Sequence, residues 1–232
     1  MSKEPRTLSF LFNLIESDYA WRISELSNYR SSLVSERNNK AQKAKIRAGV
    51  ALLYAHWEGF VLQLANWYYE FVSYQSSNIS DLNDSFASII LRSELNVLNN
   101  SNKLKDHQRV IKMIFEGMNK TAVFSSKIPI KTSNLKFEIF EDVCILLGIN
   151  PLEFESMYRR GFDRNIQHTI DKDLVGKRNS IAHGEYLSVS FEDYKKLYDI
   201  VVNGFLFNFK EIVMDCAVNK RYLREPKLTI EK

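Results

Sequence analysis

Residues 50–72 read VALLYAHWEGFVLQLANWYYEFV, and they carry the strongest structural signal in the chain. Their apolar side chains recur every three or four residues, which is the spacing of one helix face. Aromatic side chains also lie on other sides, and a helix that is apolar around so much of its surface is central to a fold. The segment predicts a central helix whose apolar face is made by Val50, Leu53, Tyr54, Trp57, Phe60, Val61, Leu64, Tyr68, Phe71 and Val72.

Helical periodicity continues on both sides of this segment. Further helices are predicted over residues 8–33, 86–98, 107–118 and 135–147, from near Thr169 onward, and from Ser190 to Cys216. Ser133 or Asn134 is the expected N-cap of the helix over 135–147. Gly148 is placed to end that helix, and Pro151 prevents its continuation.

Residues 121–134 have the weakest helical pattern. Two short segments, 121–124 and 127–130, are candidates for extended structure, and they predict a small hairpin with Pro129 on an edge. Only eight Gly and four Pro occur in 232 residues, too few for an all-β chain with many tight turns. We therefore predict an all-α fold, a bundle of about five or six helices forming a single domain over residues 1–232.

Composition limits the class of protein further. A net charge of +4 permits a nucleic-acid partner without requiring one. Cys144 and Cys216 stand far apart, which suggests buried thiols of a reduced, cytoplasmic protein. Residues 1–6 lack the pattern of a secretion signal, and no apolar run is long enough to span a membrane. No metal-ligand spacing and no glycine-rich phosphate loop occur, so we expect neither a metal nor a cofactor.

The segment RNSIAHGE, residues 178–185, places a guanidinium, an amide and an imidazole near a predicted helix end. At 100° per residue, Asn179 and His183 share a face, whereas Arg178 lies about 140° from His183. Gly184 is a natural terminator, so His183 is expected at the C-cap. One copy of the segment does not aim Arg178 and His183 at a common point, but two copies across a dyad could.

A plainer explanation of the same segment is helix capping. Cations near a helix C-terminus are favoured by ~0.3–1 kcal/mol, and Arg178 and His183 could simply hydrogen-bond the last carbonyls.

The segment resembles the Arg-x4-His signature of the HEPN superfamily, nucleotide-binding and ribonuclease domains of prokaryotic toxin and defence systems. The Ala-His-Gly-Glu ending, the helix after it and the AHWEGF stretch of residues 55–60 resemble the MAE_28990/MAE_18760-like HEPN proteins, over most of the chain. The resemblance implies a HEPN-like helical bundle. It also implies a metal-independent endoribonuclease of toxin or anti-phage defence type, acting on RNA as a homodimer whose two motifs meet at the interface. An antitoxin or a defence-system protein is the further partner implied.

The residue types suit that chemistry. Attack by the 2′-hydroxyl of RNA needs a proton acceptor, a proton donor and positive charge at the phosphorus. We expect His183 to transfer protons and Arg178 to bind the phosphate and stabilise the transition state. Asn179 is expected to orient His183 or the phosphate. HEPN toxins that are neutralised by nucleotide transfer have a tyrosine two positions after the histidine. Glu185 stands there in this chain and Tyr186 comes one position later, so that regulation is not expected.

Three further residues are candidates for a supporting role. His56 and Glu58 flank Trp57 on the central helix and could supply a second acid or base, or could be hydrogen-bonded core residues that fix helix packing. Glu185, at the end of the motif, is the third.

Two basic groups are candidates for RNA contact. Arg159, Arg160, Arg164 and Lys177 precede or enter the motif, and with Tyr158 they would suit single-stranded RNA through charge and stacking. A second group has five cations within residues 37–47, and it could hold an RNA backbone or simply form a solvated helix face or turn.

The competing function is a catalytically silent HEPN-like helical dimer that binds nucleic acid or a partner protein. RNA cleavage assays separate it from the enzyme. A purely structural interaction domain is a third reading, and it predicts no salt-dependent affinity for RNA.

Overall fold

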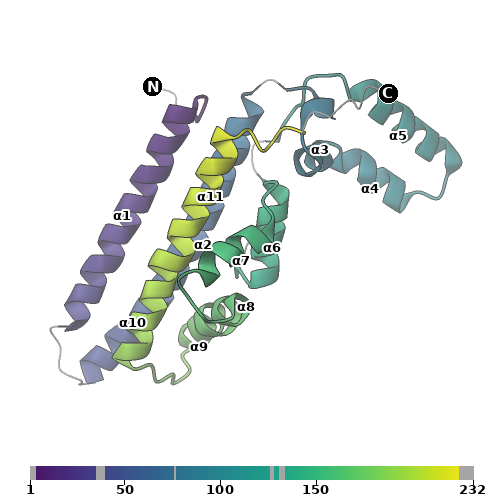
Figure 1. Cartoon of the computed structure of the whole chain (residues 1–232). Helices are drawn as coiled ribbons and strands as arrows, with labels where there is room; N and C mark the ends of the chain where they lie inside the picture. The colour runs from purple at the N-terminus through teal and green to yellow at the C-terminus, as the bar shows by residue number, and fades with distance from the viewer. Residues whose placement is uncertain (1–3, 35–39, 76, 126–127, 131–133, 225–232) are drawn as a thin grey trace.

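The computed structural model describes residues 4–34, 40–75, 77–125, 128–130 and 134–224. Every regular element in these ranges is a helix, which confirms the all-α prediction. Three long rods lie side by side (Figure 1): α1 (Leu8–Val34), α2 (Lys40–Ser73), and a continuous rod made of α10 (Phe191–Asp199), the π-helical segment η3 (Ile200–Leu206) and α11 (Phe207–Val218). α1 runs antiparallel to α2.

Shorter helices complete the body of the molecule. α6 (Phe137–Leu146) and α7 (Pro151–Arg159) lie on one flank of the long rods (Figure 1). Below them, α8 (Ile166–His168), the π-helical segment η2 (Thr169–Gly176) and α9 (Lys177–Ala182) form another continuous rod, which packs on α2. This rod carries the RNSIAHGE motif.

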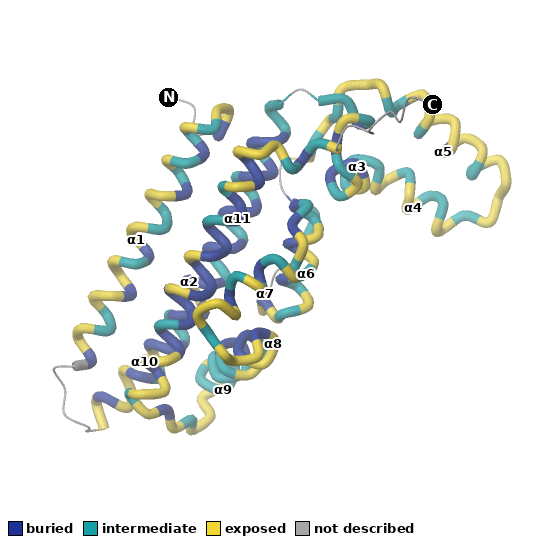
Figure 2. The backbone as a smooth tube through the Cα atoms, viewed as in Figure 1, coloured by how far each residue is buried: buried dark blue, intermediate teal, exposed yellow. Residues whose placement is uncertain are grey.

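An arm extends away from these rods. It consists of the short turn η1 (Ile79–Asp81) and the helices α3 (Asp84–Ile90), α4 (Arg92–Asn100) and α5 (Leu104–Gly117). Figure 2 shows that its outer part is mostly exposed: α4 buries none of its side chains and α5 buries only Val110. The predicted helix over 86–98 is thus two helices, which meet at Leu91.

Trp57 lies at the centre of the core. Its indole is fully buried, and the rings of Phe140, Phe154, Phe205 and Phe209 have centroids 5.0–6.4 Å from it. These rings come from α6, α7, η3 and α11. The central helix therefore packs both against the short helices α6 and α7 and against the last long rod. All ten residues that predicted its apolar face are buried.

Other predicted helices also needed correction. α2 begins at Lys40, so most of the charged stretch before Val50 is its first turns; Arg37 lies outside the described residues. α7 was not predicted, because Pro151 was taken only as a stop signal. Proline also suits the first turn of a helix, where its missing N–H is not needed. Here Asn150 is the N-cap, and its Oδ1 accepts a hydrogen bond from the N–H of Leu152 at 3.0 Å.

The hairpin predicted near 121–131 is wrong for the described part of that segment. Thr121 forms an isolated antiparallel bridge with Asn78, and the N–H of Ala122 donates to the carbonyl of Ser77. Further along, the N–H of Ile128 donates to the side chain of Asn66 on α2. The extended residues therefore find partners in other parts of the chain and not in each other.

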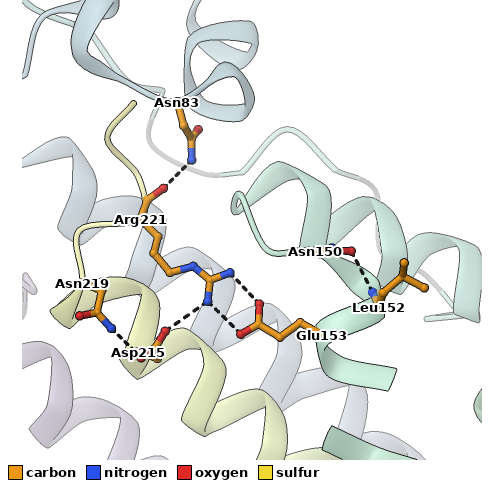
Figure 3. A network of polar contacts seen from close by, with 7 residues as sticks. All are labelled: Asn83, Asn150, Leu152, Glu153, Asp215, Asn219 and Arg221. Carbon is orange, nitrogen blue, oxygen red and sulfur yellow. Dashed lines mark hydrogen bonds and ion pairs between the residues drawn. The ribbon is translucent and has the colours of Figure 1, made fainter. Parts of the chain in front are cut away.

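Arg221 ties the end of the last rod to the neighbouring elements (Figure 3). Its guanidinium binds both carboxylate oxygens of Glu153 on α7, at 2.9 and 2.6 Å, and it also pairs with Asp215 on α11. Its carbonyl accepts a hydrogen bond from the side chain of Asn83, the N-cap of α3. This network joins α7, α11 and the base of the arm.

Both cysteines are buried and unpaired, as predicted, and burial raises the pKa of Cys216 to about 12. None of the described helices combines the length and the apolar character that crossing a membrane would require. Within the same residues, no cluster of His, Cys, Asp or Glu is arranged to hold a metal ion.

Candidate active site

The rod that carries the motif starts earlier than the sequence indicates. Asn165 is its N-cap, and its side chain accepts from the N–H of His168 at 2.8 Å. The carboxylate of Asp171, on the same rod, accepts a hydrogen bond from the N–H of Phe137 at 2.8 Å and so caps α6. At the end of η2 the N–H of Lys177 reaches the carbonyl of Lys172, five residues earlier, as in a π-helix.

The end of α9 confirms the predicted placement of His183 at the C-cap. Gly184 has φ +74°, a conformation that glycine adopts readily. Its N–H donates to the carbonyl of Ile181 and the N–H of Glu185 donates to that of Ser180, the pair of bonds of a Schellman motif. Because the backbone satisfies these carbonyls, neither Arg178 nor His183 is needed to cap them.

Arg178 is held by three contacts. Its Nη1 donates to Oδ1 of Asn134 at 3.0 Å and to Oδ1 of Asn179 at 2.8 Å. Its guanidinium carbon lies 5.0 Å from the ring centroid of Tyr54, a cation–π contact with α2. Asn179 therefore orients Arg178, and its side chain makes no hydrogen bond to His183 in the described structure.

Asn134 does not cap α6 as predicted. It has φ +60°, and the backbone then continues to Lys136, which occupies the N-cap position. This leaves the side chain of Asn134 free to accept from Arg178. Ser133, the other predicted cap, lies outside the described residues.

Two side chains on α2, Tyr54 and Glu58, support Arg178, whose guanidinium lies over the Tyr54 ring. The hydroxyl of Tyr54 donates to Oε1 of Glu58 at 2.7 Å, and the N–H of Leu135 donates to the Tyr54 hydroxyl at 2.8 Å. Burial, and then the carboxylate of Glu58, raise the pKa of Tyr54 well above its ordinary value, so its ring stays neutral beneath the cation. Glu58 thus acts on the site through Tyr54.

His183 differs from Arg178 in that its side chain is exposed and no hydrogen bond or ion pair holds it among the described residues. No contact joins the imidazole to the guanidinium within one copy of the chain, as the helical geometry predicts. On Arg178, the N–H groups of Nε and Nη2 have no partner in the described residues, so a fork of donors remains for an anion. Glu185 is exposed, and its carbonyl accepts a hydrogen bond from Nη2 of Arg47 at 2.9 Å.

His56 lies on another side of α2, away from the motif. It is 3% exposed and packs between α1 and α2, with the ring of Trp21 at 5.3 Å between centroids. Its Nε2 is 2.8 Å from Oε2 of Glu25, in poor hydrogen-bond geometry. Burial lowers the pKa of His56, and the nearby Glu25 opposes this without reversing it. The structure does not bring His56 to Arg178 or His183.

The lowered pKa of His56 predicts an acid-sensitive fold. The unfolded chain binds this proton near its ordinary pKa of about 6.5 whereas the folded chain resists it, so stability is lost as pH falls below about 6.5. We expect the free energy of unfolding, measured with urea, to fall between about pH 7.5 and 5.5, and to fall less in His56→Gln. Equal pH dependence in both proteins would contradict the assignment to His56.

The four cations predicted to bind RNA are mostly neutralised. Arg159 pairs with Glu155 at 2.6 Å, while Arg164 and Lys177 both pair with Asp173, at 3.3 and 2.7 Å. Arg160 is exposed at the end of α7. Tyr158 was expected to offer a stacking surface, but this is wrong: it is fully buried against Phe162 and Phe205, and burial raises its pKa.

The contacts of Tyr54 and Asn134 with Arg178 were not predicted from the sequence. Tyr54 lies four residues before Glu58, so the two share a helix face, and a polar pair on one face of an apolar helix is the signal that points to them. Asn134 carried no such signal, because it sits 44 residues from Arg178 in a loop.

Comparison with known proteins identifies a family. A family described as MAE_28990-like HEPN matches residues 11–222, a range that includes both the central helix and the motif. No curated protein and no solved structure matches the chain.

Proposed function

This chain belongs to the MAE_28990-like HEPN family, and from that premise we propose that it is a metal-independent endoribonuclease. HEPN domains are usually ribonucleases, although some are inactive. The proposal rests on the exposure and the hydrogen-bond partners of the two side chains, Arg178 and His183. The imidazole of His183 is exposed and has no partner among the described residues. The guanidinium of Arg178 is held in place, and its Nε and Nη2 have no partner among the same residues. A silent domain needs neither feature.

The proposed reaction starts with the 2′-hydroxyl of RNA. Its oxygen forms a bond to the adjacent phosphorus while its proton passes to a base, and the bond from phosphorus to the 5′-oxygen breaks as that oxygen takes a proton from an acid. An imidazole can fill either role near neutral pH, which assigns proton transfer to His183. Arg178 holds the phosphoryl oxygens as negative charge develops on them. The products carry a 2′,3′-cyclic phosphate and a 5′-hydroxyl.

We propose that the working site is composite and forms in a homodimer. Arg178 is committed to α2 through Tyr54, and His183 leaves the same rod about 140° away. A twofold axis near the end of α9 would bring the Arg178 of one copy to the His183 of the other, since a C2 interface repeats the same patch on both subunits.

For the biological role, we propose a toxin or anti-phage effector acting on RNA in the cytoplasm, with an antitoxin or defence-system protein as partner. Support for this finer role comes from the resemblance of the motif to HEPN proteins of such systems.

The purified protein is expected to cleave single-stranded RNA in the presence of excess EDTA. The products should end in a 2′,3′-cyclic phosphate, which mass spectrometry identifies, because the nucleophile is the 2′-hydroxyl of the substrate. A DNA oligonucleotide of the same sequence is the matched control and should stay intact, since it lacks that hydroxyl. Loss of activity with EDTA that Mg²⁺ restores would contradict the proposed chemistry, and intact RNA under all conditions would favour the silent dimer.

A further inference from the structure

A cavity of about 300 Å³ opens directly beside the motif. One wall is the first turns of α2 and the other is the segment that leaves the motif. Its lining residues are Lys40, Lys43, Ala44, Arg47, Tyr186, Leu187, Ser188 and Val189. Only two residues separate His183 from Tyr186, so this cavity begins where the candidate active site ends.

The charge of the cavity has one sign. Lys40, Lys43 and Arg47 line it, and none of the described residues that line it is acidic. Lys40 and Lys43 are exposed and have no ion-pair partner among the described residues. They thus differ from Arg159, Arg164 and Lys177, each of which is paired with an acidic residue. Unpaired cations are available to replace the counterions of a nucleic-acid backbone.

Arg47, in the α2 wall of the cavity, makes a direct contact with the end of the motif. Its Nη2 donates to the carbonyl of Glu185 at 2.9 Å, which holds the chain after the Schellman turn against α2. Its Nε is buried and has no hydrogen-bond partner in the described structure. A buried, unpartnered donor of this kind is costly unless a ligand or water satisfies it.

Tyr186 adds an aromatic surface. Its side chain is 83% exposed, although the next residue, Leu187, packs against the core. An exposed ring beside unpaired cations is the arrangement that single-stranded nucleic acids use, with bases stacking on the ring and phosphates meeting the charges.

We propose that this cavity, here called the α2 basic cavity (Lys40, Lys43, Arg47 and Tyr186), binds the RNA strand next to the bond that is cut. Lys40 and Lys43 contact backbone phosphates, and Tyr186 stacks on a base. This inference rests on the proposed ribonuclease function and names where that substrate lies. It transfers RNA contact from the cations around Arg159 to the first turns of α2.

The test measures binding of a single-stranded RNA oligonucleotide to chains that also carry His183→Ala, so that the RNA stays whole. The double variant Lys40→Gln/Lys43→Gln is expected to bind about 10-fold more weakly. The slope of log affinity against log salt should become shallower by about 1.4, since each contact to a phosphate of a single strand contributes about 0.7. Tyr186→Ala should also weaken binding about 10-fold, with the salt slope unchanged, because stacking releases no counterions. Lys103→Gln/Lys105→Gln is the matched control: it removes the same charge from exposed residues of the arm and should leave binding unchanged.

Cleavage assays on the same variants, with His183 intact, test the cavity assignment separately from the ribonuclease function. If RNA is cleaved and bound, but Lys40→Gln/Lys43→Gln and Tyr186→Ala behave like the arm control, the cavity assignment falls and the ribonuclease stands. If the unaltered protein neither binds nor cleaves RNA, both fall. Displacement of the oligonucleotide by an equal concentration of adenosine monophosphate would overturn the assignment in favour of a mononucleotide site.

Discussion

Replacing His183 with alanine is expected to slow RNA cleavage by about 10²–10⁴-fold, the usual contribution of a positioned acid or base. Stability should not change, because the imidazole is exposed and its removal leaves neither a cavity nor an unpaired partner among the described residues. Single-turnover cleavage rates and urea unfolding of the same preparations measure the two quantities.

His168→Ala is the matched control for this variant. His168 is also exposed and lies on the same continuous rod, fifteen residues before His183. Its replacement removes the same group from a place without a role in the site, and cleavage should proceed at the unaltered rate. Cleavage that persists in His183→Ala would exclude proton transfer by this residue.

Arg178→Lys is expected to reduce the rate of the chemical step by about 10²–10³-fold although the positive charge is kept. An ammonium group cannot stack flat on Tyr54, bridge Asn134 and Asn179, and still present a planar fork to a phosphate. The loss should appear in kcat more than in KM, since the guanidinium is proposed to act on charge that develops in the transition state.

Arg109→Lys provides the comparison for this substitution. Arg109 is exposed on α5 in the arm, so the same change there should leave kcat unaltered. If Arg178→Lys cleaved RNA at the normal rate, Arg178 would act only as a point charge. The contacts of Arg178 with Tyr54 and Asn134 would then not contribute to catalysis.

The central helix could be predicted from sequence because its signal is local and redundant. Ten apolar residues at helical spacing agree on one face, and all ten are buried. The ends marked by Gly148 and Gly184 were equally predictable, since both adopt positive φ, which glycine tolerates best. The last helix starts at Ser190 as predicted, and the Ser190 hydroxyl caps α10 by accepting from the N–H of Asp193 at 3.1 Å.

Features that depend on contacts between distant segments could not be predicted. Asp171 lies on the rod that carries the motif, yet it caps α6, 34 positions away in the chain. The π-helical turns of η2 and η3 leave no periodic signature, because they add a residue to a turn without changing which residue types are apolar. Residues 121–124 had the composition of a hairpin strand, yet their backbone pairs near Ser77 and Asn78.

In the candidate site, too, the residues of the local motif could be predicted, whereas the residues that come from distant segments could not. Arg178, Asn179 and His183 stand within six positions, so a short pattern finds them and their angular separation follows from helix geometry. Their surroundings come from elsewhere: Tyr54 and Glu58 from α2, and Asn134 from the loop before α6. The sequence therefore points to the candidate reacting groups, whereas the structure shows which residues position Arg178 and that the side chain of His183 is exposed.

The composite site is tested most directly by mixing two inactive chains, Arg178→Ala and His183→Ala, after unfolding and refolding them together. Random pairing makes about half of the dimers mixed, and each mixed dimer retains about one of its two Arg–His pairs across the twofold axis, so RNA cleavage should return to about a quarter of the unaltered rate. Mixed dimers can be counted by native mass spectrometry with a tag on one chain. If they form and RNA remains uncut, Arg178 and His183 do not meet between subunits, and the account of the active site is contradicted.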